Sequence, residues 1–494
     1  MPAQGNATAG DGRAVTRQML IGGELVAGER GFASLNPATG EIYGYAPEAS
    51  IADTEAAIAA ARRAFDTTDW STNTEFRAHC LEQFYAALRD NVEELRDLTI
   101  AEVGATRMMT HANQLETPFE IVKYFAGLAR TYERTQDLGI IEDRGKKHRR
   151  WVEREASGVV AAIAAYNYPH QLALAKLAPA LAAGCTVILK GAPDTPLATL
   201  ALGEIIARHT DIPAGVVNVL SGSDVEVGKT MTTHRDVDVV SFTGSTVVGR
   251  QIMSAAGDSL KRVFLELGGK SAAILLDDGD VGTAAMFGAF SICSHAGQGC
   301  AITTRMLVPR DRQEEVAQTV AGFMSKVSYG DPNDMSNYMG PLISERQREK
   351  VHGLVTRAVD AGAKLVCGGE KVDPGYFYTP TLLTDVDPDS ELAQEEVFGP
   401  VLAMIPFDDD EEAVAIANNS IYGLSGGVFS ADEERALGVA RRIRTGTMSI
   451  NGGNYFHPDV PFGGYKQSGI GREMGVAGIE EFLEQKAFAA VVNE

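Results

Sequence analysis

The sequence is poor in cysteine, in positive charge and in long apolar runs. Its five cysteines form no CxxC pair and no zinc-binding pattern, so neither a disulfide framework nor a zinc site is expected. Lys and Arg total 44 against 66 Asp and Glu, which argues against nucleic acid or an anionic membrane as a partner. No apolar stretch reaches about 18 residues, so no transmembrane helix is expected.

The nine histidines include no HExxH spacing, so no metal is expected either. Residues 1–13 are polar and rich in Gly and Ala, without the basic start and apolar run of a signal peptide. They are predicted to form a disordered tail, and the protein is predicted to be cytoplasmic. A chain of 494 residues has room for two or three domains.

The central part of the chain alternates short apolar segments with helical ones, which predicts an α/β fold. The predicted strands of the first alternation are residues 159–164, 186–189, 216–220, 237–242 and 263–267. Short strands that are almost wholly apolar indicate a parallel sheet covered by helices on both faces. A second alternation, from 270 to about 465, predicts a second α/β domain. Ligands bind such sheets at the carboxyl ends of the strands.

The flanking regions have patterns of their own. Ser50 and Asp53 predict a capping box at the start of a helix, and further helices are predicted at 74–89, 92–103 and 111–135. The charged, alternating segment 143–154 indicates a solvent-exposed hairpin. A helix near 478–484 is followed by the apolar segment 487–492. Such a segment often adds itself to another sheet, which predicts a homodimer or homotetramer.

Several residues at predicted strand ends are suited to chemistry. Cys300 lies between Gly299 and Ala301, so a reagent has access to its sulfur. Residues 243–249 join a strand to a helix and would suit a pyrophosphate. Lys190 and Asn167 follow predicted strands, and Glu266 lies at the end of one. Taken alone, Glu266 is more often a surface acid and Asn167 more often a turn residue.

The order and spacing of these segments resemble the NAD(P)-dependent aldehyde dehydrogenase superfamily over nearly the whole chain. The matching positions are 36–41, Asn167, Lys190, 242–246, 266–270, 297–300, 396–400, 461–469 and 471–473. The resemblance implies a Rossmann-type cofactor domain of residues 1–133 and 155–267 and a catalytic α/β domain of residues 268–465. It also implies a small β oligomerisation segment made of 134–154 and 482–494.

The resemblance assigns catalytic roles. Cys300 would attack the aldehyde to form a thiohemiacetal and then a thioester, with the oxyanion held by Asn167 and the Cys300 backbone N–H. Glu266 would activate the hydrolytic water and assist deprotonation of Cys300. Lys176 and Glu473 resemble the proton-relay pair of the family.

The resemblance also implies NAD as the cofactor. Its binding residues would be Ile163, Ala164, Ala165, Tyr166, Lys190, Gly222, Gly228, Phe242, Thr243, Gly244, Ser245, Leu267, Gly268, Glu396 and Phe398. Pro193 stands where many relatives have a glutamate that repels a 2′-phosphate, so NADP stays open as an alternative cofactor. Asp224 stands where a further glycine is common.

The substrate is expected to be a small-molecule aldehyde, medium or bulky and hydrophobic rather than charged like betaine aldehyde or succinic semialdehyde. The candidate tunnel residues are Tyr168, Gln171, Leu172, Ile292, Gly299, Ala301, Tyr455, Phe456 and Phe462. Two alternatives remain. A coenzyme A-acylating relative would commonly lack a base at Glu266, and a non-catalytic member would have lost Cys300, Glu266 or Asn167. Cys293 is expected to be structural.

Overall fold

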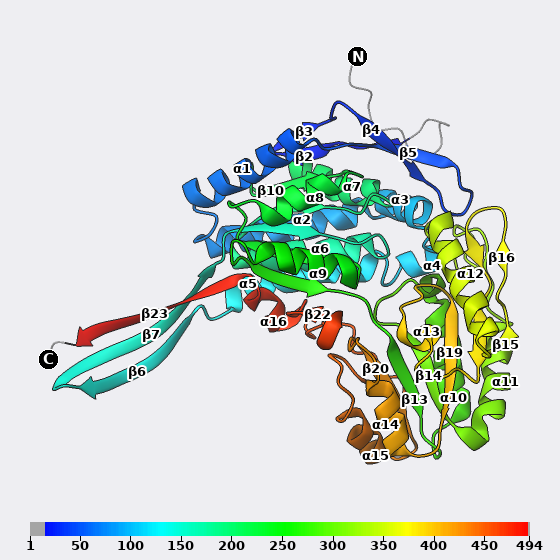
Figure 1. Ribbon diagram of the computed structural model, residues 1–494. Coiled ribbons are helices and arrows are strands. Elements are labelled where there is room, and N and C mark those ends of the chain that lie inside the picture. The colour runs from blue at the N-terminus through cyan, green and yellow to red at the C-terminus, as the bar shows by residue number, and fades with distance from the viewer. Residues whose placement is uncertain (1–14, 493–494) are drawn as a thin grey trace.

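The structure is a computed structural model that describes residues 15–492. The predicted disordered tail lies outside these residues, as do positions 1–14 of the predicted cofactor domain and 493–494 of the predicted oligomerisation segment. Figure 1 shows two α/β bodies side by side and a three-stranded sheet that extends away from the first of them. None of the helices in the described residues combines the length and apolar character needed to cross a bilayer.

The first body is built around an 8-stranded sheet with the order β22-β12-β11-β8-β9-β10-β2-β3. All the predicted strands of the first alternation are present, as β8 (Val159–Ile163), β9 (Thr186–Lys190), β10 (Val217–Leu220), β11 (Val239–Thr243) and β12 (Arg262–Glu266). They are mutually parallel. Because β8 has β9 on one side and β11 on the other, the chain order reverses at β8, and such a reversal opens a ligand-binding crevice at the strand ends.

Helices cover both faces of this sheet (Figure 1). Between the strands, the sequence predicts helices at 171–183, 196–209, 226–233 and 247–256. They are present as α6 (Pro169–Ala183), α7 (Pro196–His209), α8 (Val225–Thr233) and α9 (Thr246–Ala256). The predicted capping box is confirmed at the start of α1 (Ile51–Thr67), where the Ser50 and Asp53 side chains each accept from the other residue's backbone N–H. The helices α2 (Thr74–Asp90) and α3 (Val92–Val103) also match.

Two helix predictions were too long. The segment 111–135 contains only α5 (Glu116–Thr131), because residues 111–115 form a turn after the short α4 (Arg107–Thr110). The Glu116 carboxylate at the start of α5 accepts from Arg96 at 2.5 Å, a tertiary contact that fixes where this helix begins. Near the C-terminus, α16 (Gly475–Glu480) ends before 484, since Leu483 already pairs in a strand.

The second body contains a 7-stranded sheet with the order β15-β18-β19-β14-β13-β20-β21. Within the second alternation, the sequence predicts strands at 272–276, 305–308, 402–406, 426–429 and 447–450. They are present as β13 (Ser271–Leu275), β14 (Thr303–Pro309), β19 (Val401–Phe407), β20 (Gly426–Phe429) and β21 (Ser449–Ile450). Cys300 packs against the apolar core of the first body and Ile302 against that of the second. The Cys300 loop therefore lies between the two bodies.

The remaining elements complete these layers. The helices are α10 (Val281–Cys293), α11 (Gln313–Met324), α12 (Glu345–Asp360), α13 (Glu391–Gln394), α14 (Asp410–Asn418) and α15 (Glu433–Ala440). The strands are β1 (Val15–Thr16), β2 (Met19–Ile21), β3 (Glu24–Val26), β4 (Gly31–Leu35), β5 (Ile42–Pro47), β15 (Lys364–Cys367), β16 (Lys371–Val372), β17 (Phe377–Tyr378), β18 (Thr381–Thr384) and β22 (Gly469–Ile470).

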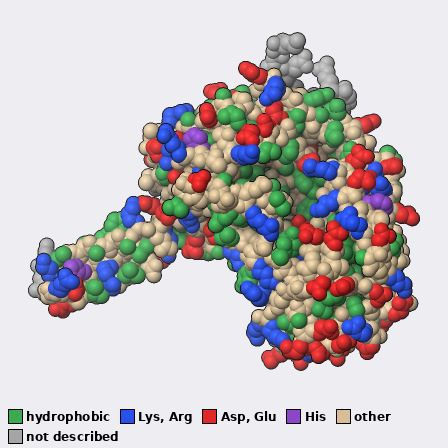
Figure 2. All heavy atoms as spheres, in the orientation of Figure 1, with side chains coloured by type: hydrophobic (Ala, Val, Ile, Leu, Met, Phe, Trp, Pro, Cys, Tyr) green, Lys and Arg blue, Asp and Glu red, His purple; other side chains and the backbone are tan. Residues whose placement is uncertain are grey.

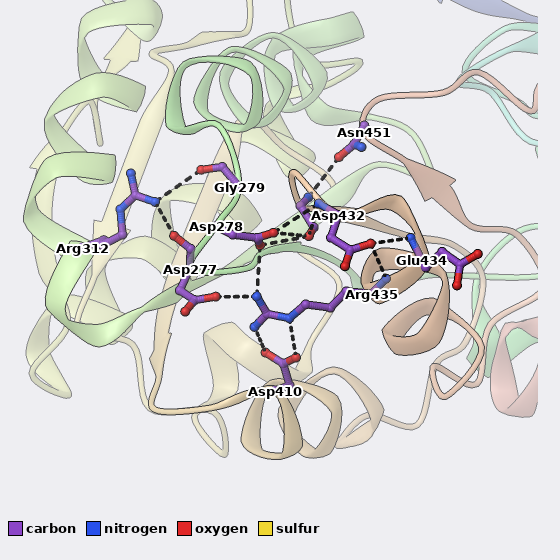
Figure 3. A network of polar contacts seen from close by, with 10 residues as sticks. Asp277, Asp278, Gly279, Arg312, Asp410, Asp432, Glu434, Arg435 and Asn451 are labelled. Carbon is purple, nitrogen blue, oxygen red and sulfur yellow. Dashed lines mark hydrogen bonds and ion pairs between the residues drawn. The ribbon is translucent and has the colours of Figure 1, made fainter.

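A polar network holds the outer end of the second sheet (Figure 3). Arg435 of α15 donates to Asp410 of α14 at 2.7 Å and to Asp277, which follows β13, at 2.6 Å. Asp278 accepts from the Ser430 hydroxyl at 2.8 Å. These side chains are partly exposed, so each ion pair contributes modestly to stability and the network serves mainly to fix how the two helices lie against the sheet.

The protruding sheet has the order β23-β7-β6. The predicted exposed hairpin is confirmed as β6 (Thr135–Asp143) and β7 (Lys146–Ala156). The predicted C-terminal apolar segment lies in β23 (Leu483–Val492), which pairs antiparallel with β7 of its own chain. The segment therefore completes an internal sheet, and its apolar character does not by itself require a second subunit.

Candidate active site

Cys300 lies on a rigid loop between α10 and β14. Earlier in this loop, His295 and Ala296 have φ angles of 48° and 51°, in the left-handed region that side-chain-bearing residues seldom adopt. Such strain persists only where the surroundings fix it. Here the buried Gln298 amide donates to the backbone oxygens of His295 and Pro341, both at 3.2 Å. The loop thus presents Cys300 in a defined position.

The end of β12 brings Glu266 towards the thiol. A Cβ added to Gly269 would lie 2.2 Å from the Cys300 carbonyl oxygen, so the segment after Glu266 passes this close only because residue 269 is glycine. Burial, and next the charge of Glu266, raise the pKa of the Cys300 thiol above its ordinary value. The resting side chain is therefore a neutral thiol with an acidic group nearby.

Glu266 is a buried carboxyl group without a hydrogen-bond partner among the described residues. A Cβ on Gly463 would lie 2.6 Å from its Oε1, so the glycine provides the space that this carboxyl occupies. Burial, and then the charge of Glu473, raise the pKa of Glu266 well above its usual range. A carboxyl group with a raised pKa and free lone pairs is suited to take and release a proton near neutral pH.

The two residues of the predicted proton relay are in direct contact. The Lys176 ammonium, from α6, donates to the Glu473 carboxylate at 2.8 Å, and both side chains are buried. Lys176 and Glu473 are also among the charges that act on the pKa of Glu266. The structure therefore brings the pair next to the candidate base.

Asn167, which follows β8, lies at the same loop. Its side-chain Nδ2 donates to the Gln298 carbonyl oxygen at 2.9 Å, and its own carbonyl oxygen accepts from the Gln114 amide at 3.0 Å. An amide NH₂ group has two hydrogens, so one remains for a ligand beside Cys300.

The predicted cofactor residues gather at the carboxyl ends of β8, β9, β11 and β12. The Lys190 ammonium donates to the Gly222 carbonyl oxygen at 2.8 Å, and burial lowers the pKa of Lys190 to about 8. Ser245 caps α9, and Glu396 accepts from the Gly269 N–H at 2.9 Å. At the same edge lie Ile163, Ala164, Ala165, Tyr166, Phe242, Thr243, Gly244, Leu267 and Gly268.

These residues fit a dinucleotide. The strand order reverses at β8, and α9 directs its free backbone N–H groups towards this edge, where they suit a pyrophosphate. The rings of Tyr166 and Phe398 meet edge to face at 5.9 Å. Gly228, which is also a predicted cofactor residue, lies within α8. Among the described residues, a Cβ added to it would have no atom within 4 Å, so no protein group lies close to this position.

A cavity of about 740 Å³ opens above Cys300. Of the predicted tunnel residues, Tyr168, Gln171, Leu172, Gly299, Ala301, Tyr455 and Phe456 line it. Phe462 and Ile292 do not: Phe462 packs behind Phe456 with the ring centroids 5.8 Å apart, and Ile292 is buried in the second core.

Sequence reasoning missed one wall of this cavity. Met286, Phe287 and Phe290 of α10 and Tyr338 line it as well. Met286 and Phe290 are four residues apart on a helix, so they share one face, and this spacing was a usable signal. Among the cavity-lining residues that the structure describes there is no Asp, Glu, Lys, Arg or His.

Cys293 is remote from this chemistry. It ends α10 and is buried in the apolar core of the second body. Across residues 15–492, no group of three or more His, Cys, Asp or Glu side chains is arranged to hold a metal ion.

A half-buried thiol beside a cavity, an unpaired buried carboxyl group near it and a nucleotide-type strand edge are the features of an α/β oxidoreductase. The chain belongs to the aldehyde dehydrogenase family, because the model of that family matches residues 26–488. The predicted family, the predicted α/β fold and the prediction of an aldehyde-oxidising enzyme are thereby confirmed.

Individual relatives match over almost their full length. A 3-succinoylsemialdehyde-pyridine dehydrogenase from a Pseudomonas species is 40% identical over 95% of this chain and 98% of its own. An aldehyde dehydrogenase of Mycobacterium tuberculosis, solved with NAD+, is 42% identical, with a TM-score of 0.92 over 96% of this chain and 98% of its own. A variant of aldehyde dehydrogenase C from Pseudomonas syringae, solved with NAD+ and octanal, is 39% identical, with a TM-score of 0.90 over 96% of each chain.

Proposed function

We propose that the protein oxidises an uncharged, medium or bulky hydrophobic aldehyde to its carboxylic acid, with NAD+ as the electron acceptor. The observation that carries this proposal is the cavity above Cys300, whose described lining has aromatic, aliphatic, amide and hydroxyl side chains but no charged ones. Burying a charged group there without a partner would cost several kcal/mol. The NAD+ and octanal in the structures of relatives point the same way.

Cys300 begins the reaction. Its thiol passes a proton to the unpaired Glu266 carboxylate, and the sulfur then adds to the aldehyde carbonyl carbon to form a thiohemiacetal. The hydrogen of the Asn167 amide that Gln298 does not use and the Cys300 N–H donate to the new oxyanion. NAD+, when bound, supplies the acceptor for the hydride that leaves the same carbon.

Glu266 completes the cycle. Once the hydride has left, Cys300 holds the acyl group as a thioester. Glu266 takes a proton from a water molecule, and the resulting hydroxide attacks the thioester carbon. The C–S bond then breaks to give the carboxylic acid and the Cys300 thiolate, and the thiolate takes up the proton of the acid. The buried Lys176–Glu473 pair beside Glu266 offers a path for the proton to leave. An intact base at this position supports hydrolysis over transfer of the acyl group to coenzyme A.

The test is the formation of NADH with an aldehyde panel. The ratio kcat/KM should rise along the series propanal, hexanal, octanal, because each further buried methylene gains about 0.8 kcal/mol. Succinic semialdehyde and betaine aldehyde should react at least about 10-fold less efficiently than octanal. No NADH with any aldehyde would refute the function. NADH that forms only when coenzyme A is present would instead favour the acylating alternative.

A matched pair of variants locates the specificity. Met286→Arg adds a positive charge to the cavity wall and should move the preference from octanal towards succinic semialdehyde. Met335→Arg is the control, because Met335 is 56% exposed outside the cavity and Met286 is comparably exposed at 47%. An identical substrate profile for both variants would contradict the proposed cavity.

We also propose that the protruding sheet joins subunits in a homodimer or homotetramer. All residues of the edge strand β6 are exposed, and Leu138, Ile140 and Ile141 are 45%, 57% and 40% exposed. Figure 2 shows hydrophobic side chains along this sheet. An exposed edge strand with an apolar face is a surface that proteins normally cover.

Ile140→Asp should lower the oligomer mass measured by light scattering after size-exclusion chromatography, because it places a charge in the covered face. Gln136→Asp, on the same strand, is the control and should leave the mass unchanged. A wild-type protein that is monomeric, or an Ile140→Asp variant with an unchanged mass, would refute this role of the sheet.

Residues 15–133 and 155–267 are proposed as the cofactor domain and 268–465 as the catalytic domain, supported by the separate sheets and cores. A cytoplasmic location is proposed on the ground that all five cysteines are free.

A further inference from the structure

The choice between NAD+ and NADP+ concerns the end of β9. In a dinucleotide-binding sheet, an acid near the end of the second strand hydrogen-bonds the 2′-hydroxyl of the adenosine ribose and disfavours a 2′-phosphate. After β9 this chain has the uncharged Pro193. The next acid, Asp194, is half-buried, its pKa is raised by burial, and Arg346 lies near enough to offset its charge. Pro193 therefore has no charge to offer, and the charge of Asp194 is offset by the neighbouring Arg346.

Another segment brings an acid to this place. Glu48 lies between β5 and α1, and its carboxylate accepts from the Ser223 N–H at 2.9 Å, the Ser223 hydroxyl at 2.8 Å and the Asp224 N–H at 3.0 Å. These donors lie at the N-terminal end of α8, where backbone N–H groups and the helix dipole favour an anion. Glu48 therefore binds at a helix end that favours anions. Its hydrogen-bond donors are uncharged, so none of them neutralises the carboxylate.

Glu48 and Lys190 bind to the same peptide unit, the one that joins Gly222 to Ser223. The Gly222 carbonyl oxygen accepts from the Lys190 ammonium at 2.8 Å, and the N–H of the following residue, Ser223, donates to Glu48. Since the C=O and N–H of a peptide point in opposite directions, the two side chains lie on either side of it. Standard peptide dimensions place the ammonium and the carboxylate at most about 8 Å apart.

We propose that Glu48 determines the preference of this enzyme for NAD+ over NADP+. The inference rests on the proposed function, in which NAD+ binds at the ends of the strands, and it takes Lys190, at the end of the second of these strands, to lie beside the adenosine ribose. A 2′-phosphate beside Lys190 would be close enough to be repelled by the Glu48 carboxylate. The N-terminal end of α8, which would otherwise attract the phosphate, is already occupied by that carboxylate. NAD+ has no group at that position and is not penalised.

The variant Glu48→Gln tests this, because glutamine keeps the size and an acceptor oxygen for the Ser223 N–H but removes the charge. Isothermal titration calorimetry without aldehyde gives Kd for both cofactors. The NADP+ Kd should fall by about 10-fold or more, and the NAD+ Kd should change by less than about 3-fold. Thermal unfolding of each variant checks that the fold is kept.

Two controls sharpen the result. Asp194→Asn removes the nearer acid in sequence, and Glu41→Gln removes an exposed acid from the same N-terminal region; neither should improve NADP+ binding. The proposal is overturned if Glu48→Gln leaves the NADP+ Kd unchanged, if it weakens both cofactors equally, or if Asp194→Asn is the variant that gains NADP+. A wild-type enzyme that binds neither cofactor would refute the proposed cofactor use itself, and this inference with it.

Discussion

Cys300→Ser is expected to reduce aldehyde oxidation by on the order of 10⁴-fold or more while leaving NAD+ binding nearly intact. A serine hydroxyl at this position has no base that can ionise it efficiently, and an ester is a poorer acyl carrier than a thioester. The side chain lines the aldehyde cavity, while the proposed cofactor contacts come from the ends of other strands. Turnover is followed by NADH absorbance and NAD+ binding by calorimetry.

Cys367→Ser is the matched control. Cys367 is a free, half-buried thiol on β15 that packs against the core of the second body, so its replacement should leave turnover unchanged. Equal turnover in Cys300→Ser and the wild type would show that another group is the nucleophile. A parallel loss of NAD+ binding and thermal stability would show instead that the loop had collapsed.

Glu266→Gln is expected to lower steady-state turnover by about 10² to 10⁴-fold, the usual contribution of a general base. Glutamine has nearly the shape of glutamate, so the loss reports on proton transfer more than on packing. Hydride transfer precedes the step that needs this base. Stopped-flow absorbance should therefore show one equivalent of NADH formed in a burst, followed by slow release of the acid.

The pH profile gives a second readout. Because the pKa of Glu266 is raised, its basic form is scarce at low pH, and hydrolysis in the wild type should accelerate as pH rises through that pKa. The variant should lose this rise. Glu480→Gln, which changes an acid on α16 that contacts Tyr132, is the control and should behave as the wild type. An unchanged steady-state rate in Glu266→Gln would exclude this residue as the base.

Much of the site was predictable because several of its reactive side chains lie at the ends of strands that the sequence itself identifies. Asn167 follows β8 and Glu266 ends β12, and parallel strands bring their carboxyl ends to one edge. Cys300 stands out in the sequence through its small neighbours. The ion pair between Lys176 and Glu473 joins residues far apart in the chain. It was predictable only through the family resemblance, since no local pattern encodes it.

The parts that failed depend on tertiary contacts. The predicted helix from 111 was too long because Arg96 fixes Glu116 at the start of α5. Phe462 was a candidate tunnel residue by its position in the sequence; its ring packs against that of Phe456, and it is not among the residues that line the cavity. The α10 wall was missed because an apolar helix face serves a core and a substrate cavity equally well, and only the fold decides between them.

The burial of Cys300 has a consequence for the survival of the enzyme under oxidative conditions. Peroxide and related oxidants react with the thiolate, and the first product, a sulfenic acid, proceeds to irreversible forms when oxidant is plentiful. Burial and the charge of Glu266 keep the resting sulfur protonated. The raised pKa that keeps Cys300 protonated in the enzyme without aldehyde therefore also slows the oxidation of its sulfur.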